Sequence, residues 1–534
     1  MSTAPVDPDV SAPIALTGRI VTMDDQATVI ERGVLYARDG AIAAVLPSGA
    51  PAPDGFADVP HVHTRGTIYP GLVELHNHLP YDVLSLWPVP KKFGNRDQWS
   101  GPSTPDYHRL ISGPMAVLGR DVDVVPAVVR YVEMRCLLGG TTTSQGVALA
   151  SRPGIVTHFR GLVRNVESTG DPRLPPAATH IADVDATDAE HFLARISGKQ
   201  KLILHLSEGV DASAHRHFEA LHLPSGEWAI TDNLIGIHCV ALTPADFETF
   251  AAHGGSMVWS PLSNLLLYGK TADVAAARAA GVPIALGSDW APSGSKNLLG
   301  ELKVARLAAD LPGSDLIAMA TRTPAQMLGW GAHIGSLEAG KRADLIVVNT
   351  ADGDPYDTLI DATEAALSLV VINGVPRVGT RSLMTHLGLG GERITVAGKP
   401  RVVNLAQVGA DPQVASVPVA EAIRRLRAAL AALPDATTAP PAIAELSARP
   451  LLAVSGVIDN HMSPRPHLPY RGQLTGPNLP GRRVPQTVGA PLPLPALTLD
   501  ALTAVDNPAY FKALGAEPNL PVDIRDALSA QGAP

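Results

Sequence analysis

The chain has 534 residues, of which 46 % are apolar, and its net charge is −9. This length predicts about three or four domains at roughly 150 residues each, or fewer where one of them is a barrel. No block rich in lysine and arginine occurs in the sequence. We therefore expect no nucleic-acid binding, because a surface that neutralises phosphates needs clustered cations.

Three features of the sequence indicate where in the cell the protein is expected to reside. Cys136 and Cys239 lie far apart and form no C-x-x-C motif, which argues against a disulfide framework and a cysteine-rich metal site. Residues 1–10 carry acids and prolines without an apolar stretch, so we expect no secretory signal. No uncharged apolar run approaches the ~18 residues of a membrane span. We expect a soluble, cytoplasmic protein without a membrane partner.

The N-terminal part of the chain, residues 1–69, reads as short strands joined by turns. The runs G-R-I-V-T-M, G-V-L-Y-A-R-D-G and A-I-A-A-V-L have the composition of strands. Asp39-Gly40 between the last two is a hairpin signal. We expect this part to contribute strands to a small β-domain.

The pattern changes to an α/β alternation over residues 70–334. Apolar strand-like runs are separated by helical stretches rich in alanine and leucine, which is typical of parallel strands covered on both faces. Eight such runs occur: 71–76, 141–146, 161–167, 178–184, 201–206, 234–240, 256–261 and 283–289. Eight units over roughly 250 residues predict a TIM-like (β/α)₈ barrel.

Strands return over residues 335–404, in the runs A-D-L-I-V-V-N, S-L-V-V-I-N-G-V and R-I-T-V-A-G. We expect both flanks of the barrel to build one β-sandwich domain. Residues 405–534 form a Pro/Ala-rich extension with one amphipathic helix at 419–433. Its apolar content predicts packing on the barrel or on a second subunit, and we expect a homodimer or a higher homo-oligomer.

Two histidines close the first barrel strand in G-L-V-E-L-H-N-H-L-P, residues 71–80. Residues i and i+2 of a strand face the same side, so His76 and His78 both point into the barrel at its C-terminal end. Active sites of such barrels lie at that end. Two imidazoles there could bind one metal ion at ~2.0–2.1 Å each. The pairs with the same spacing at 61 and 63 and at 215 and 217 we interpret as structural and as surface histidines.

Further polar residues end later strands of the predicted barrel. His205 ends the fifth strand and Glu208 follows it, His238 ends the sixth, and Asp289 ends the eighth. A lone polar residue at such a place is more often a hydrogen-bonded core group. Several that converge on one rim would be costly to bury unpaired. A metal ion would remove that cost.

Six motifs in this order resemble the amidohydrolase superfamily, most closely its cytosine deaminase and s-triazine chlorohydrolase branch. They are P-G-L-V-E-L-H-N-H, H-L-S-E-G, I-H-C, S-P-L-S-N-L-L-L-Y-G, L-G-S-D-W and I-G-S-L-E-A-G-K-R-A-D-L-I-V-V. The resemblance covers about residues 14–380 and leaves out the C-terminal extension. It implies a metal-bearing barrel with a flanking β-domain.

The resemblance also implies roles for individual residues. One divalent metal ion per chain, Zn²⁺ or alternatively Fe²⁺, is held by His76, His78, His205 and Asp289. His238 then contacts the metal-bound water or the substrate, and Asp289 takes the proton of that water. Glu208 carries a proton to the leaving group. Asn264 fixes a loop or touches substrate, and Glu74 faces inward one layer deeper.

The number of metal ions depends on strands three and four. Two-metal relatives usually place a carboxylated lysine at the end of strand four, and the run A-T-H-I-A-D-V-D has no lysine. Strand three offers Glu167, which could be a second-metal ligand or a salt-bridge partner of Arg164. We predict a single metal ion.

The substrate is hinted at by aromatic residues in the long loop after strand one. Trp87, Phe93 and Trp99 could form an apolar lid over the metal, or could pack the loop onto the barrel or a partner chain. Trp290, directly after Asp289, is expected to border the site. These residues favour a small, flat or hydrophobic substrate.

The sequence therefore predicts a metal-dependent hydrolase of a non-peptide C–N bond, which deaminates an aromatic or heterocyclic amine through a metal-activated water. One alternative is hydrolysis of an amide, a cyclic amide or a C–halogen bond at the same site. The other is a non-catalytic relative that kept the barrel for binding.

Overall fold

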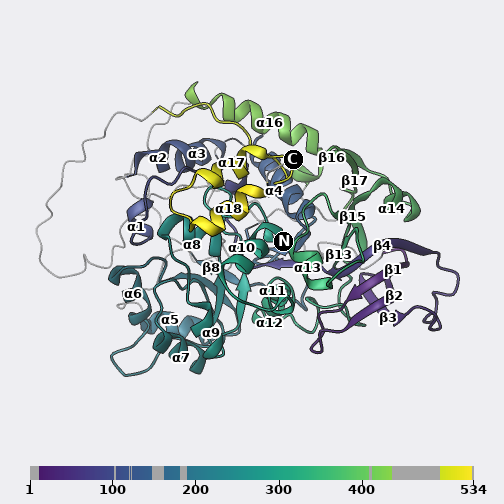
Figure 1. The fold of residues 1–534 in the computed structure, drawn as a ribbon, viewed down its shortest axis with the longest axis horizontal. Helices are drawn as coiled ribbons and strands as arrows, with labels where there is room; N and C mark the ends of the chain where they lie inside the picture. The colour runs from purple at the N-terminus through teal and green to yellow at the C-terminus, as the bar shows by residue number, and fades with distance from the viewer. Residues whose placement is uncertain are drawn as a thin grey trace, which may run out of the picture.

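The computed structural model describes residues 11–100, 104–119, 121, 123–146, 161–180, 189–407, 412–435 and 493–531. Its fold combines one large mixed sheet with two parallel sheets and the helices around them (Figure 1). Residues 1–10 and residues 436–492 of the Pro/Ala-rich extension lie outside the described residues.

Strands from both flanks of the chain pair in one nine-stranded sheet, in the order β16-β17-β15-β14-β13-β4-β1-β2-β3. Strand β4 joins the two flanks, since it runs parallel to β1 and antiparallel to β13. The strands are β1 (Ile14–Val21), β2 (Val29–Arg38), β3 (Ala41–Pro47), β4 (His61–Pro70), β13 (Leu345–Val348), β14 (Leu367–Ile372), β15 (Val375–Thr380), β16 (Glu392–Val396) and β17 (Lys399–Val403).

The predicted hairpin turn between β2 and β3 is confirmed. Asp39 and Gly40 have φ values of 53° and 77°. Two consecutive positive φ values give the turn a twist that matches right-handed strands, and Asp-Gly adopts them at little cost.

A parallel strand lies within each of the eight runs that the sequence predicts. They are β5 (Leu72–Glu74), β6 (Thr141–Ser144), β7 (Arg164–Asn165), β8 (Ala178–His180), β9 (Leu202–Leu206), β10 (Leu234–His238), β11 (Ser256–Trp259) and β12 (Ile284–Leu286). The pairing forms two sheets, β5-β6-β7 and β12-β11-β10-β9-β8. Backbone hydrogen bonds also connect the sheet edges, from Ala177 N to Val166 O at 3.1 Å and from Asp289 N to His76 O at 3.1 Å.

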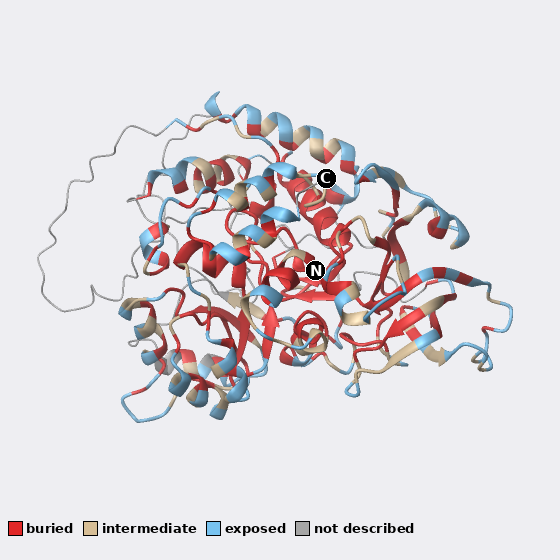
Figure 2. Cartoon of the chain, in the orientation of Figure 1, coloured by how far each residue is buried: buried red, intermediate tan, exposed pale blue. Residues whose placement is uncertain are grey.

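Helices follow most of these strands and cover them from outside. They include α4 (Val125–Leu138), α5 (Ala189–Ile196), α6 (Ala212–Glu219), α7 (Pro244–Ala252), α8 (Pro261–Tyr268), α9 (Val274–Ala279), α10 (Leu298–Ala308), α11 (Gly313–Met319) and α12 (Arg322–Met327). Buried residues gather in the middle of the molecule, around the parallel strands (Figure 2). The strand ends therefore open into an interior from which water is largely excluded.

The described part of the C-terminal extension packs on the rest of the chain, in line with one of the two expectations. Helix α16 (Val419–Ala431) lies along α4 with Leu426 and Leu430 buried against it (Figure 1). Residues 493–531 add α17 (Pro508–Ala516) and α18 (Val522–Ala530). Asp500 of this segment forms a buried ion pair with Arg135 of α4 at 2.9 Å and also contacts Lys296.

Within the described ranges, no helix has both the length and the apolar character needed to cross a lipid bilayer.

Candidate metal centre and active site

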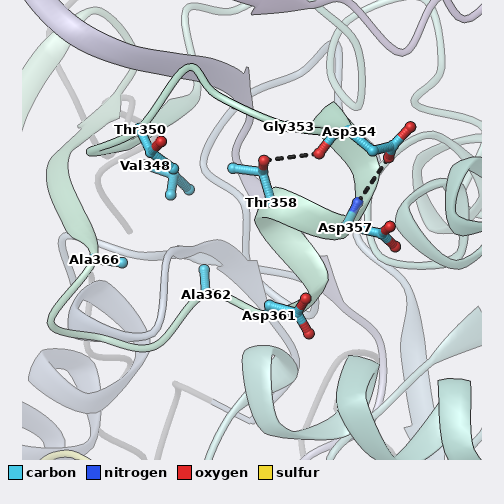
Figure 3. A pocket seen from close by; sticks show the side chains of 9 residues that line it. All are labelled: Val348, Thr350, Gly353, Asp354, Asp357, Thr358, Asp361, Ala362 and Ala366. Carbon is cyan, nitrogen blue, oxygen red and sulfur yellow. Dashed lines mark hydrogen bonds between the residues drawn. The ribbon is translucent and has the colours of Figure 1, made fainter.

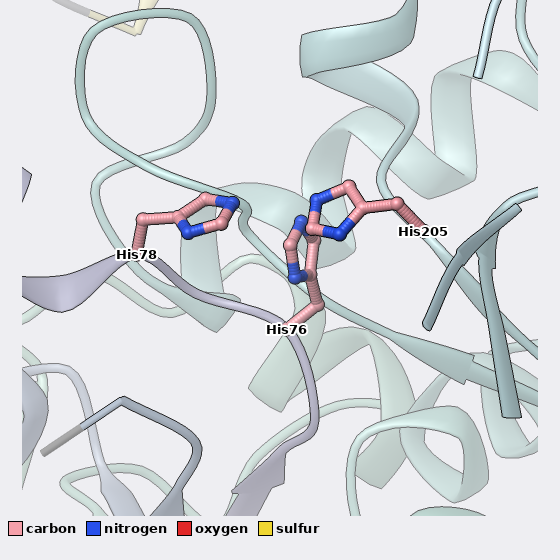
Figure 4. A group of neighbouring side chains, drawn as sticks. All are labelled: His76, His78 and His205. Atoms are coloured by element: carbon pink, nitrogen blue, oxygen red, sulfur yellow. The ribbon is translucent and has the colours of Figure 1, made fainter. Parts of the chain in front are cut away.

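Five predicted residues meet at the C-terminal ends of the parallel strands. His76 and His78 follow β5, His205 lies in β9, His238 ends β10 and Asp289 follows β12. The rings of His76, His78 and His205 converge (Figure 4), and their ligand atoms lie within 4.8 Å of one another. The same limit holds for His76, His238 and Asp289. The five side chains come from strands far apart in the sequence, and the fold brings them together at one site.

Asp289 stands at the centre of this group. Its Oδ1 lies 2.9 Å from His76 Nε2 and 3.5 Å from His78 Nε2. Its Oδ2 accepts a hydrogen bond of 2.6 Å from the Ser263 hydroxyl on α8. The backbone of Asp289 has a φ of 64°, an uncommon conformation for a non-glycine residue and one often found at functional sites.

The chemistry of these donors fits a divalent metal ion. Both ring nitrogens of His76 and Nδ1 of His205 are buried and have no well-directed hydrogen bond among the described residues. Burial, together with the charge of His76, lowers the pKa of His78 to about 3 and holds the pKa of His205 well below its ordinary value. Burial opposes ionisation of Asp289, but neighbouring His76 keeps the pKa of that carboxyl below its usual range. Neutral imidazoles beside a carboxylate are the ligand forms that zinc requires.

Glu208 and His238 lie next to the donors and to each other. Glu208 Oε1 is 3.9 Å from His238 Nε2, and both side chains are buried. Asn264 of α8 contacts the other ring nitrogen, with Oδ1 at 2.9 Å from His238 Nδ1. Asn264 thus fixes the ring of His238, and its Nδ2 donates to Thr271 at 3.2 Å.

Glu74 faces inward below the donors, as expected. Its carboxylate accepts hydrogen bonds from the backbone N of Ser288 at 3.2 Å and from the Ser144 hydroxyl at 3.3 Å, and the Ser288 hydroxyl also contacts it. Burial raises the pKa of Glu74 above its ordinary value. Since Ser288 directly precedes Asp289, these bonds hold the turn that carries the aspartate.

An aromatic wall borders the donors. The ring of Trp290 lies 5.9 Å from that of His78, and Tyr81 is 5.2 Å from Trp290. Trp99 packs at 5.8 Å on Trp290. Trp87 is buried in the same loop but stacks on Phe93, with ring centroids 6.3 Å apart. Of the predicted aromatics, Trp290 is the one in ring contact with a donor histidine.

Sequence reasoning assigned no role to Tyr81, Arg96 and Tyr268 of this site, whereas Ser263 lies beside Asn264 in the motif S-P-L-S-N-L-L-L-Y-G. Tyr81 belongs to the 3₁₀ turn η1 (Leu79–Val83), directly after the histidine motif, and its position there could have been noticed. Arg96 and Tyr268 contact Glu208, and Ser263 contacts Asp289. No motif includes Arg96, which sits in an irregular loop. Tyr268 lies within S-P-L-S-N-L-L-L-Y-G, but nothing in that motif shows that its hydroxyl reaches Glu208.

The strand-three glutamate lies in another setting than the donors. Glu167 accepts from Gly146 N at 3.1 Å and from Asn165 Nδ2 at 2.8 Å. It is absent from the groups of possible metal ligands among the described residues. The alternative of a salt bridge between Glu167 and Arg164 is wrong, because Arg164 pairs instead with Asp344 and Asn373.

The two other histidine pairs lie away from the strand ends. His61 and His63 belong to β4, where His63 Nδ1 is 2.7 Å from the Thr17 hydroxyl. His215 and His217 lie on α6, where His215 Nε2 contacts Asp246 at 2.8 Å. Their surroundings agree with structural and partly exposed roles.

A separate surface cavity of about 350 Å³ lies between β13 and α13 (Pro355–Ile360). Asp354, Asp357 and Asp361 line it (Figure 3). Arg306 forms ion pairs with Asp357 and Asp361. This cavity contains none of the strand-end residues, so it is distinct from the candidate metal centre.

Comparison with known proteins gives the same family as the motifs. Residues 177–377 match the model of the amidohydrolase family. A 5-methylthioadenosine/S-adenosylhomocysteine deaminase from Symbiobacterium thermophilum is 27 % identical over 376 residues, covering 62 % of this chain and 84 % of the relative. The deaminase of the same name from Desulforudis audaxviator is 25 % identical over 414 residues, covering 70 % of this chain and 93 % of the relative.

Solved structures agree at the level of the fold. A zinc-bound adenosine deaminase from Xanthomonas campestris superposes with a TM-score of 0.55 at 19 % identity, over 78 % of this chain and 98 % of that chain. Zinc-bound atrazine chlorohydrolase TrzN from Arthrobacter aurescens TC1 gives a TM-score of 0.55 at 21 % identity, over 77 % and 100 %. The resemblance predicted from the motifs is thus confirmed: residues 177–377 form an amidohydrolase family domain, and the similar proteins include deaminases and a triazine-type chlorohydrolase.

Proposed function

We propose that this protein is a metal-dependent hydrolase of a non-peptide C–N bond, which deaminates an aromatic or heterocyclic amine. The observation that carries the proposal is the buried group of imidazoles around Asp289, with Glu208 and His238 beside it. Similarity to deaminases over most of their length supports deamination over the other reactions of the family.

In this proposal His76, His78, His205 and Asp289 hold one divalent ion per chain. Zinc is the ion named in the two similar structures, and three imidazoles with one carboxylate suit it. Once bound, such an ion supplies a water nucleophile at neutral pH, because it lowers the pKa of that water to about 7. All remaining steps fall to the side chains of the chain.

The side chains would divide the proton transfers. Asp289 accepts the proton of the attacking water on Oδ1, while its Oδ2 stays held by Ser263. Glu208 passes a proton to the departing ammonia, and general acid–base help of this kind contributes about 10²–10⁴-fold. His238, whose Nδ1 contacts Asn264, turns Nε2 towards the substrate.

The aromatic wall supports a flat substrate. Trp290 and Tyr81 present ring faces and edges next to His78. Aromatic rings stack favourably on other flat rings. A heterocyclic amine would lie against this wall with its amino-bearing carbon towards the metal.

For the architecture we propose a closed barrel and a β-sandwich, as the sequence predicts. The eight parallel strands would close into one barrel over residues 70–334, supported by the backbone hydrogen bonds between the sheet edges. The nine-stranded sheet would fold as a sandwich over 1–69 and 335–404, helped by register shifts such as that between Gly18 and Ile20. The proposed assembly is a homo-oligomer.

The test is ammonia release. Metal-loaded protein is incubated with a panel of adenine-, guanine-, cytosine- and triazine-type amines, and ammonia is measured together with the spectral change of the ring. The proposal expects turnover of at least one amine and none by Asp289→Asn. Opening of amides or cyclic amides without any ammonia would show the alternative hydrolase instead. No reaction of either kind would favour a binding protein.

A further inference from the structure

Tyr268 contacts the proposed proton shuttle directly. It is the last residue of α8, ahead of Gly269, which ends the helix with a φ of 66°. The Tyr268 side chain is buried, and its hydroxyl lies 2.6 Å from Glu208 Oε1. The distances from the Glu208 carboxylate to Arg96 Nη1 and to His238 Nε2 are longer, at 3.5 and 3.9 Å.

Trp99 decides the direction of that hydrogen bond. The indole Nε1 of Trp99 donates to the Tyr268 hydroxyl at 2.9 Å. An indole N–H can only donate, and a phenol has a single proton. Tyr268 therefore accepts from Trp99 and gives its own proton to Glu208. Oε1 of Glu208 is thus held as an acceptor of the Tyr268 hydroxyl, which fixes the orientation of the carboxylate.

The loop that carries Trp99 is attached to the chain around Glu208. Arg96 N donates to the backbone O of Glu208 at 3.3 Å, and its Nη1 lies 3.5 Å from Oε2. The backbone O of Gly94 accepts from Val210 N at 2.7 Å. A Cβ on Gly209 would lie 2.5 Å from that oxygen, so the two segments approach more closely than a larger residue would allow.

This loop also closes the site. His76, His205, Glu208 and Asp289 are each less than 5 % exposed. Within the described residues these side chains are covered, so movement of a covering segment would open them to a substrate. The loop from residue 84 to residue 100, in which Trp87, Phe93 and Trp99 are buried, covers this region. It is joined to neighbouring segments by isolated backbone hydrogen bonds, such as Trp87 N to Pro292 O and Phe93 N to Leu267 O, and by a single β-bridge between Asn95 and Gly209.

We propose that Tyr268 is a positioning residue that couples closure of the loop 84–100 to the orientation of Glu208. In the closed loop Trp99 directs the Tyr268 hydroxyl onto Oε1 of Glu208. In the open loop this constraint is released, and the carboxylate turns more freely. The inference rests on the proposed function, because it makes Tyr268 the residue that orients Glu208, the proposed proton carrier.

The main variant is Tyr268→Phe, which removes the hydroxyl and keeps the ring. We expect unchanged metal content and a kcat lower by about 10- to 100-fold, a part of the general acid–base contribution. KM should change little, because the lost contact orients the shuttle and does not bind substrate. Tyr69→Phe is the matched control: it removes a partly buried hydrogen bond of 2.6 Å from a tyrosine of β4, in the nine-stranded sheet, to Pro355 O, and should leave kcat unchanged.

The role of Trp99 is tested by a double-mutant cycle. Trp99→Phe should lower kcat in the same direction, and the double variant with Tyr268→Phe should be no slower than Tyr268→Phe alone. Side chains that act through one hydroxyl give such non-additive effects. Fully additive losses would separate the loop from Glu208 and overturn the coupling, as would a Tyr268→Phe variant with wild-type kcat.

A separate readout keeps the inference testable if the wild-type protein releases no ammonia. That result would refute the proposed deamination. The coupling is then judged by amide hydrogen exchange over residues 93–100, which should be faster in Tyr268→Phe and unchanged in Tyr69→Phe, because exchange reports local opening. Equal exchange in Tyr268→Phe and wild type would overturn the coupling as well.

Discussion

Asn264 selects the ring form of His238. Its Oδ1 lies 2.9 Å from His238 Nδ1 while its Nδ2 donates to Thr271, so Nδ1 must carry the imidazole proton. The unprotonated Nε2 then faces Glu208 at 3.9 Å. Burial, partly opposed by Glu208, lowers the pKa of His238 and keeps the ring neutral.

Asn264→Ala should therefore slow turnover without removing the metal. Loss of a residue that orients an active-site histidine typically costs about 10- to 100-fold in activity. Steady-state kinetics and metal content of the purified variant measure both effects. Wild-type kcat in Asn264→Ala would show that the Asn264 amide matters only for its hydrogen bond to Thr271 and not for the ring of His238.

Asp289→Asn should abolish turnover with the fold largely intact. The substitution keeps the size of the side chain and its contact with Ser263, but it removes the proton acceptor and weakens one ligand. Circular dichroism checks the fold, and ammonia release checks the activity. Substantial residual activity would exclude Asp289 as the proton acceptor.

Glu208→Gln should keep the metal and lose rate. The amide still accepts from Tyr268 but carries no proton to the leaving group, so we expect a loss of about 10²–10⁴-fold in kcat. The measurement pairs kinetics with metal analysis. Loss of the metal in this variant would instead identify Glu208 as a ligand.

Asp500→Ala should destabilise the protein. Asp500 neutralises Arg135 and contacts Lys296 in a buried position. Removing one partner of a buried ion pair costs about 3–5 kcal/mol, because the remaining charge is left uncompensated. Denaturant unfolding measures the change. The control Asp523→Ala, at an exposed residue of α18, should stay within about 0.5 kcal/mol of wild type.

Glu301 should make the free energy of unfolding depend on pH. Burial raises the pKa of Glu301 to about 8 from an ordinary value of 4.5, and its Oε2 has no hydrogen-bond partner among the described residues. The folded state then binds more protons than the unfolded state, so the contribution of Glu301 is complete below pH 4.5 and is lost as the pH rises through 8.

Glu301→Gln removes this titration and keeps the acceptor for Leu262 N. Denaturant unfolding at pH 5 and at pH 8 should show the variant gaining stability relative to wild type at the higher pH. A difference that is equal at both pH values would contradict the buried, protonated state of Glu301.

The sequence predicted the parallel strands and the residues at their ends because both have local signatures. An apolar run marks a buried strand, and a histidine or aspartate that ends such a run is conspicuous. Tyr268 and Arg96 have no such signature: their importance comes from the loop that folds over Glu208, a contact between residues far apart in sequence. The same reason hid Asp500, whose partners Arg135 and Lys296 belong to other parts of the chain.

The lid was predicted in outline only. The aromatic content of the loop after β5 indicated an apolar cover, but which ring touches the donors depends on how the loop packs. Trp290 and Tyr81 contact His78, whereas Trp87 stacks on Phe93. Aromatic residues within one loop cannot be ranked from composition, because burial and orientation are set by tertiary packing.

The metal content per chain tests the central claim most directly. The protein is purified without added metal or chelator, and zinc and iron are measured by mass spectrometry against protein concentration. The account predicts one zinc or iron ion per chain, reduced in a His76→Ala variant. Protein that holds no ion and takes none up on incubation would contradict it, and two ions per chain would contradict the single-metal site.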